Sequence, residues 1–216
     1  MLDLGCGSGY GTASLAKSHP RVVGLDRIPP DADSRASRGH FLRAVLEGIP
    51  LAPRSFELVV SFQVIEHLED PAPYIGAISD LLAPNGVALI TTPNVLMSDG
   101  VNPYHVHEYR ADELAERLRT RFESIEMRGV GASEPVHRYL EQRSRRIRRI
   151  MRLDPLGLRN RLPRPLVDWL FARFALLVRR QTASGDGTPE VGWRDFPVGP
   201  ADERCLDLLA VCRGPR

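Results

Sequence analysis

Three glycines near the start of the chain have the spacing G-x-G-x-G, from Gly5 to Gly9. Glycines let the backbone approach a ligand closely because no Cβ stands in the way. Where such a turn leads into a helix, the helix N-terminus also favours negative charge. Dinucleotide-binding turns need a third glycine three residues after the second, but Tyr10 or Thr12 occupies that place in the two registers. The turn therefore predicts a cofactor cradle that is not a dinucleotide site.

Two acidic residues accompany this turn: Asp3 precedes it, and Asp26 follows Gly9 by 17 residues. A carboxylate at the end of the second strand can accept hydrogen bonds from both hydroxyls of a ribose. A buried carboxylate such as Asp3 usually holds a cation or a structural hydrogen bond. A ligand with a ribose, a carboxylate and a positive centre satisfies these features. Alone, the turn could be only a turn, and Asp26 could cap the segment that begins at Pro29.

Histidines are the residues that most readily remove a proton near neutral pH. His67 follows an apolar stretch, and open α/β sheets bind ligands at the carboxyl ends of their strands; it could instead cap or pack the next helix. His105 and His107 are two residues apart, which places them on one side of an extended segment. Substrate contact is favoured for this pair. No metal site is expected, because no third or fourth ligand stands out.

Strands and helices must position these residues, and their patterns alternate along the chain. Nearly continuous apolar stretches are typical of strands that are buried on both faces. The sequence predicts strands at 1–4, 21–26, 40–43, 56–62, 86–92, 122–130 and 205–212. It predicts helices at 12–18, at 71–82 after a cap at Asp70, and around 114–118. This alternation predicts an α/β, doubly wound, mostly parallel sheet.

The long stretch before the last strand interrupts this pattern. A structureless loop of that length would be unusual, so helices are expected near 136–152 and 166–180, with a break at 184–187. The predicted organisation is a core at 1–132, an Arg-rich helical insert at 133–204, and a final strand and tail at 205–216. Because the chain begins inside its first strand, we expect the true start to lie upstream; a lost N-terminal helix is the alternative.

Three motifs, in order, resemble those of class I S-adenosylmethionine-dependent methyltransferases. Residues 2–9, LDLGCGSG, look like the first motif of that family. Residues 56–68, FELVVSFQVIEHL, are similar to the fourth-strand motif of the subgroup that includes ubiquinone-biosynthesis enzymes. Residues 82–94 resemble the turn into the fifth strand. The resemblance covers about residues 1 to 130 and the final strand, and implies a Rossmann-like sheet of seven strands with the last antiparallel.

The resemblance also implies S-adenosylmethionine as cofactor and methyl transfer to a small-molecule or lipid- or sugar-type acceptor. By position it implies that Asp3, Gly5, Gly7 and Gly9 line the methionine and ribose end, that Asp26 holds the ribose hydroxyls, that Val45 and Leu46 flank the adenine, and that the backbone of Phe62 and Gln63 faces the methionine amino group. Val45 departs from the pattern, since many relatives carry an aspartate there. The alternatives are a catalytically inactive binding or scaffold protein and, less favoured, an aminopropyltransferase.

Charge is distributed unevenly. Residues 134–182 contain 13 arginines and 4 acidic residues, a net +9, whereas the whole chain carries +2, so the rest carries −7. This segment could be a solvated helix face, attract an anionic acceptor, or rest on an anionic membrane surface. Nucleic-acid binding is disfavoured, because few aromatic residues interleave the arginines.

Three cysteines make no disulfide framework, and neither a signal peptide nor a transmembrane segment is visible. We therefore expect a cytoplasmic protein, with peripheral membrane contact as an alternative.

Overall fold

A computed structural model describes residues 1–100, 102–151 and 191–216. These residues fall into two compact units, one formed by residues 1–131 with 198–216 and the other by the described part of 132–197. The first contains the whole sheet and all the residues that the motifs single out.

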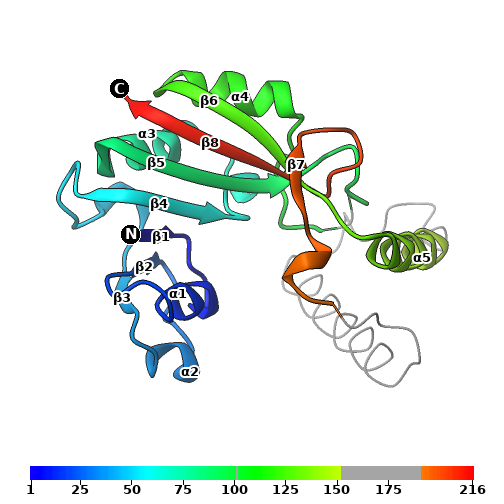
Figure 1. Ribbon diagram of the computed structural model, residues 1–216, viewed down its shortest axis with the longest axis horizontal. Helices are drawn as coiled ribbons and strands as arrows, with labels where there is room; N and C mark the ends of the chain where they lie inside the picture. The colour runs from blue at the N-terminus through cyan, green and yellow to red at the C-terminus, as the bar shows by residue number, and fades with distance from the viewer. Residues whose placement is uncertain (101, 152–190) are drawn as a thin grey trace. The chain divides into compact units, whose positions relative to one another are not determined.

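The first unit is built on an eight-stranded sheet with the order β3-β2-β1-β4-β5-β8-β6-β7 (Figure 1). The strands are β1 (Leu2–Leu4), β2 (Val23–Asp26), β3 (His40–Arg43), β4 (Phe56–Phe62), β5 (Leu82–Pro93), β6 (Phe122–Val130), β7 (Val198–Pro200) and β8 (Asp207–Pro215). The pairings from β3 to β5 are parallel, whereas β8 is antiparallel to both β5 and β6. The predicted α/β class and the antiparallel last strand are therefore confirmed. After β3 the chain returns to the other side of β1, so β1 and β4 flank the point where the strand order reverses, which is where such sheets bind ligands.

The sheet differs from the prediction in one strand and in several strand limits. β7 is an eighth strand, antiparallel to β6, and its three residues lie in the segment expected to belong to the insert. The valine, glycine and proline of β7 offer no apolar alternation that a sequence pattern could reveal, and proline is tolerated at a sheet edge. β5 begins at Leu82 rather than at residue 86. β8 runs to Pro215, three residues further than expected.

Four helices belong to this unit: α1 (Tyr10–Leu15), α2 (Ala32–Arg35), α3 (Ala72–Leu81) and α4 (Ala111–Arg119). α1 starts and ends earlier than predicted, and the short α2 was not predicted. α3 begins as expected, because Asp70 Oδ1 accepts a hydrogen bond from the Ala72 N–H at 3.0 Å. Two 3-10 turns, η1 (Leu46–Gly48) and η2 (Ile65–His67), follow β3 and β4.

The core of this unit lies between the central strands and the apolar faces of α3 and α4. α3 buries Tyr74, Ile75 and Ile78 completely or nearly so. α4 buries Leu114 and Leu118. These side chains join one cluster with the apolar residues of β1, β4, β5 and β8. The packing holds the carboxyl ends of β1, β4 and β5 at fixed positions, from which the loops of the candidate site begin.

The described part of the second unit contains one long helix, α5 (Glu134–Met151), and a 3-10 turn, η4 (Trp193–Asp195). α5 corresponds to the helix expected near 136–152. Two pairs four residues apart, Glu134 with Arg138 and Glu141 with Arg145, form ion pairs along α5. The predicted helix at 166–180 and the break at 184–187 lie outside the described residues. Among the helices that the structure describes, none is both long and apolar enough to cross a membrane.

Candidate functional site

The glycine turn forms a loop that crosses the carboxyl end of β2 before α1 begins. Gly5, Gly7 and Gly9 all have positive φ, at 80°, 54° and 92°. The backbone N–H of Gly5 donates to the carbonyl oxygen of Leu25 at 2.8 Å, which fixes the start of the loop on β2. L-residues with side chains rarely adopt such φ values, so the backbone explains why glycines stand here.

The three glycines face different surroundings. A Cβ on Gly5 would clash with the side chain of Val64, and one on Gly9 would lie 2.6 Å from the ring of Phe41. A Cβ on Gly7 would have no atom within 4 Å. Gly5 and Gly9 therefore allow the loop to pack closely against neighbouring side chains of the same domain. Gly7 borders open space that a ligand can fill.

Asp26 joins the glycine loop to the end of β2. Its Oδ2 accepts a hydrogen bond from the Gly7 N–H at 2.8 Å, and its Oδ1 accepts one from the Ile28 N–H at 3.0 Å. An ionised carboxylate has about four acceptor positions. Asp26 therefore orders both loops and retains capacity for two further donors. The bond to Ile28 closes a local turn, but Asp26 does not cap the next helix, because α2 has Asp31 as its N-cap, with Oδ1 accepting from the Ser34 N–H at 2.7 Å.

Asp3 is 6% exposed, and its side chain lies beneath the glycine loop. The hydroxyl of Thr12 donates to Asp3 Oδ2 at 2.6 Å, which ties β1 to α1. Burial raises the pKa of the Asp3 carboxyl, and the Thr12 hydrogen bond partly opposes this shift. Asp3 thus makes the structural hydrogen bond that was one of its two expected roles.

The residues expected to contact the adenine and the methionine amino group lie at or just after the carboxyl ends of β3 and β4. Val45 is exposed, whereas Leu46 is partly buried against the core. The Gln63 backbone has φ 58°, and its N–H donates to the carbonyl oxygen of Thr91 at 3.0 Å. Large apolar side chains are exposed after, or at the end of, each of the strands β1 to β4: Tyr10, Ile28, Val45 and Phe62. Exposed apolar groups at the edge of a cradle favour the binding of a partly apolar ligand.

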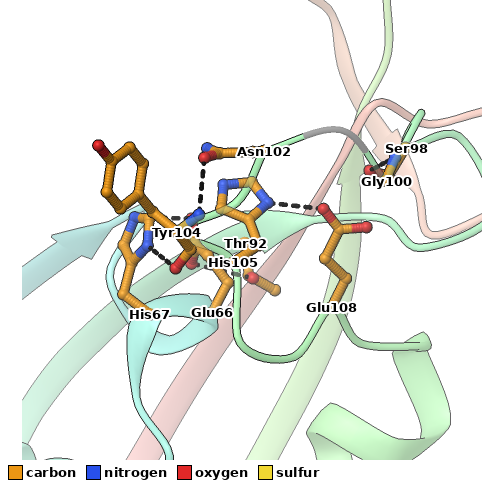
Figure 2. Close-up of polar contacts among 9 residues, drawn as sticks. All are labelled: Glu66, His67, Thr92, Ser98, Gly100, Asn102, Tyr104, His105 and Glu108. Atoms are coloured by element: carbon orange, nitrogen blue, oxygen red, sulfur yellow. Dashed lines mark hydrogen bonds and ion pairs between the residues drawn. The ribbon is translucent and has the colours of Figure 1, made fainter. Parts of the chain in front are cut away.

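The histidines lie beyond this edge, and the structure pairs them differently from the sequence spacing. His67 ends η2, and its ring packs edge-on against the ring of His105 with centroids 5.1 Å apart (Figure 2). His105 belongs to the loop after β5. His107 is not part of this pair, because its Nε2 lies 2.7 Å from Glu113 and its ring contacts Tyr109. His105 and His107 therefore make separate contacts.

Glu66 is a functional candidate that the sequence analysis passed over. Its side chain is completely buried, and Thr92 donates its hydroxyl to Oε2 at 3.1 Å. Its Oε1 has no hydrogen-bond partner among the described residues and lies 4.0 Å from His67 Nε2. Burial raises the pKa of this carboxyl, whereas the neighbouring histidines lower it. The available signal was an acidic residue within the apolar run that ends β4 and forms η2.

Comparisons with known proteins agree with these features. Residues 2–90 match the methyltransferase domain family. A probable S-adenosylmethionine-dependent methyltransferase of Mycolicibacterium smegmatis is 39% identical over 128 residues, which are 56% of this chain and 50% of that protein. The mitochondrial ubiquinone biosynthesis O-methyltransferase of Arabidopsis thaliana is 32% identical over 106 residues, 45% of this chain and 33% of that protein. The chain thus spans half or less of the length of these relatives.

A solved structure supports the fold independently. The crystal structure of an SAM-dependent methyltransferase from Thermotoga maritima, described as a possible histamine N-methyltransferase, has a TM-score of 0.59 at 12% identity and covers 99% of this chain and 80% of its own. At this identity the likeness concerns the fold alone. The family resemblance drawn from the three motifs is confirmed. Residues 2–90 are therefore a methyltransferase domain, and the chain is a homologue of the S-adenosylmethionine-dependent methyltransferases.

Proposed function

We propose that this protein transfers a methyl group from S-adenosylmethionine to a hydroxyl of a small-molecule acceptor. The observation that carries the proposal is the hydrogen bond between Gly7 and Asp26 beside open space at the carboxyl edge of the sheet. This arrangement presents a carboxylate and an unobstructed stretch of backbone to one ligand. It lies in the domain that matches the methyltransferase family.

The residues of the edge fit the parts of this cofactor. Asp26 would accept hydrogen bonds from the two ribose hydroxyls with its remaining lone pairs. Val45 would contact the adenine through an apolar surface only, since valine cannot accept from its amino group. At Gln63 the N–H is engaged with Thr91, so the methionine amino group would meet a backbone carbonyl. Asp3 would support the loop from inside through Thr12.

When bound, S-adenosylmethionine supplies a methyl group on a sulfonium that an aligned nucleophile displaces. A hydroxyl nucleophile must lose its proton, whereas a neutral amine needs no such help to attack. Glu66, His67 and His105 provide carboxylate and imidazole groups at the carboxyl end of β4 and in the loop after β5. We assign the handling of the acceptor hydroxyl to this group. His107 is left out because its contacts are with Glu113 and Tyr109.

The charge of residues 134–182 favours an anionic acceptor within the small-molecule, lipid-linked or sugar-type classes. A net +9 raises the local concentration of anions through long-range attraction. The same charge would also favour peripheral contact with an anionic membrane. The acceptor is therefore expected to be anionic, and membrane contact would be a separate property of the same segment.

Calorimetric titration of the full chain with S-adenosylhomocysteine tests the central step. We expect one site per chain, with weaker binding for Asp26→Ala and unchanged binding for the matched control Asp33→Ala, an exposed acid in α2. Transfer of labelled methyl groups to a small-molecule extract then tests activity. If neither the cofactor nor its demethylated product binds, the proposal fails and the scaffold interpretation gains support.

A further inference from the structure

We propose that Glu66, His67 and His105 bind a divalent transition-metal ion, with zinc as the best match to their donor atoms. One potential ligand atom of each residue lies within 4.8 Å of the other two. The ion would lie beyond the carboxyl end of β4, at the residues to which we assign the handling of the acceptor hydroxyl. Its binding follows from these residues alone, whereas its suggested role rests on the proposed function.

The first observation is the orphaned oxygen of Glu66. This side chain is 0% exposed, and its Oε1 has no hydrogen-bond donor among the described residues. A buried carboxylate oxygen without a partner is costly. Thr92 orients the group through the other oxygen, at 3.1 Å. A cation at Oε1 would supply the partner that the described residues do not.

The second observation is the orientation of both imidazoles. His67 Nδ1 lies 2.8 Å from the carbonyl oxygen of Tyr104, which can only accept, so Nδ1 carries the proton. His105 Nδ1 lies 2.6 Å from the carboxylate of Glu108, which fixes the same tautomer. In the neutral rings both Nε2 atoms then carry a lone pair. Metal-bound histidines typically have this second partner, a carboxylate or a backbone carbonyl, on the other ring nitrogen.

The third observation is that backbone hydrogen bonds hold η2, which carries Glu66 and His67, against the loop after β5, which carries His105. The carbonyl oxygen of Glu66 accepts hydrogen bonds from the N–H groups of Val106 and His107, at 2.7 and 3.2 Å. The Asn102 side chain accepts from the Tyr104 N–H at 3.1 Å and thereby shapes the loop that presents His105 (Figure 2). Residues 38 positions apart in the chain are therefore held together without an ion.

The donor set selects the class of ion. Two imidazole nitrogens and one carboxylate oxygen match the three protein ligands of open catalytic zinc sites. They also suit ferrous iron, whereas magnesium and calcium prefer oxygen ligands. Zinc bonds of about 2.1 Å would bring the ligand atoms to roughly 3.4 Å from one another, so the cluster would contract by roughly 1 Å on loading. His67 is 40% exposed, which gives an ion a route of entry.

An ion with three protein ligands keeps a position for the acceptor. A hydroxyl bound there would have a lowered pKa and a fixed direction. Its proton would leave to water, and the oxygen would then form the new bond to the methyl carbon as the sulfur–methyl bond breaks. Metal binding would thus combine deprotonation and orientation of the acceptor in one group.

Metal binding to the full chain without a histidine tag tests the site directly. After EDTA treatment and dialysis, we expect about one equivalent of Zn²⁺ by elemental analysis, and visible absorption bands of a low-symmetry site with Co²⁺. Glu66→Gln and His105→Gln should each weaken binding at least 100-fold. Glu108→Gln should weaken it about 10- to 100-fold, as for other outer-shell partners. His107→Gln is the matched control from the same loop and should bind as the natural chain does.

The outcomes separate this proposal from the methyltransferase function. If the natural chain takes up no more Zn²⁺ or Co²⁺ than a chain lacking all three ligands, and both retain the same far-UV circular dichroism, the metal site is refuted. S-adenosylhomocysteine binding by the EDTA-treated chain should stay unchanged, so the proposed function can survive that result. Metal uptake without cofactor binding would overturn the proposed function and leave the metal site standing.

Discussion

Gly7 and Asp26 are joined by a hydrogen bond of 2.8 Å from the Gly7 N–H to Asp26 Oδ2. This contact links the loop after β1 to the end of β2, across 19 positions of sequence. One carboxylate therefore shapes the cradle and faces the space that the cradle encloses. Its removal should affect ligand binding more than folding, because Asp26 is only partly buried and its two donors are the backbone N–H groups of Gly7 and Ile28, neither of which is a buried residue.

Asp26→Ala should weaken S-adenosylhomocysteine binding at least tenfold. Two charge-assisted hydrogen bonds to the ribose would be lost, each contributing about 1.5–3 kcal/mol, and about 1.4 kcal/mol corresponds to tenfold in affinity. Calorimetric titration measures the change, with circular dichroism as the check on folding. An unchanged dissociation constant in a folded Asp26→Ala variant would remove Asp26 from the site.

Gly5→Ala and Gly7→Ala should separate folding from binding. A methyl group on Gly5 clashes with Val64, whereas one on Gly7 enters open space. Both also place alanine at positive φ, which costs about 1–2 kcal/mol, or roughly 2–8 °C in Tm for a domain of this size. We therefore expect Gly5→Ala to lower the Tm more than Gly7→Ala, while Gly7→Ala loses cofactor affinity by steric obstruction.

The double variant Gly5→Ala with Val64→Ala provides the control for this comparison. Removing the Val64 methyl groups takes away the two nearest atoms that the new Cβ would meet and leaves only the Val64 Cβ, at 3.4 Å. The decrease in Tm of the double variant should be smaller than the sum of the decreases in the two single variants. Strict additivity would mean that the clash does not explain the intolerance of Gly5, and normal binding by Gly7→Ala would contradict the cradle.

Asp3→Asn should stabilise the ligand-free protein at neutral pH. Burial raises the pKa of Asp3 in the folded state above its ordinary value. The folded state therefore holds this proton more tightly than the unfolded state, and stability falls as pH rises through the raised pKa. The loss of folding stability that ionisation of Asp3 causes is fully present above the raised pKa and absent below the unfolded-state pKa of about 3.9. Asparagine carries no such charge and keeps an acceptor for Thr12.

Thermal unfolding across pH tests this prediction. The Tm of Asp3→Asn should exceed that of the natural chain near pH 7, and the gap should narrow as the pH approaches about 4. Asp33→Asn, at an exposed position, is the matched control for removal of one negative charge. A gap for Asp3→Asn that is constant with pH would show that ionisation of Asp3 is not its source.

The strands around the cradle could be predicted because their burial leaves a direct trace in the sequence. β3, β4 and β6 have the predicted limits, and apolar residues fill most of β4. β7 left no such trace, because its pairing depends on the neighbouring edge of β6 rather than on its own residues. β5 starts early because the turn after α3 continues directly into the sheet, where Phe56 pairs with Leu82 across a register shift.

The acceptor side of the site was less accessible to sequence reasoning. The spacing of His105 and His107 indicated a pair, but the chain bends at Val106, between them, instead of running extended. The partner of His105 is His67, brought there by hydrogen bonds to the Glu66 carbonyl oxygen. Such a contact depends on how two loops close in space. No periodicity within either loop encodes it.

Arginines of α5 should act on the acceptor rather than on the cofactor. Replacing Arg145, Arg146, Arg148 and Arg149 with glutamine removes four of the charges in the +9 segment. The residues proposed to hold the cofactor all lie in the other unit, before residue 95. S-adenosylhomocysteine affinity should therefore stay unchanged, whereas the KM for an anionic acceptor should rise.

Salt and a charge-matched control distinguish this attraction from a general effect of net charge. The rise in KM should be largest at low salt, because screening over about 8–10 Å at physiological ionic strength weakens attraction in both proteins. Glutamine at the exposed Arg21, Arg38, Arg54 and Arg119 makes the same change in net charge within the first unit and should leave the KM nearly unchanged.

Flotation with vesicles containing phosphatidylglycerol, against pure phosphatidylcholine, reports membrane contact separately. Loss of flotation in the α5 variant with an unchanged KM would assign the charge to a membrane surface. Unchanged kinetics at low salt, without any flotation of the natural chain, would mean that the arginines form only a solvated helix face.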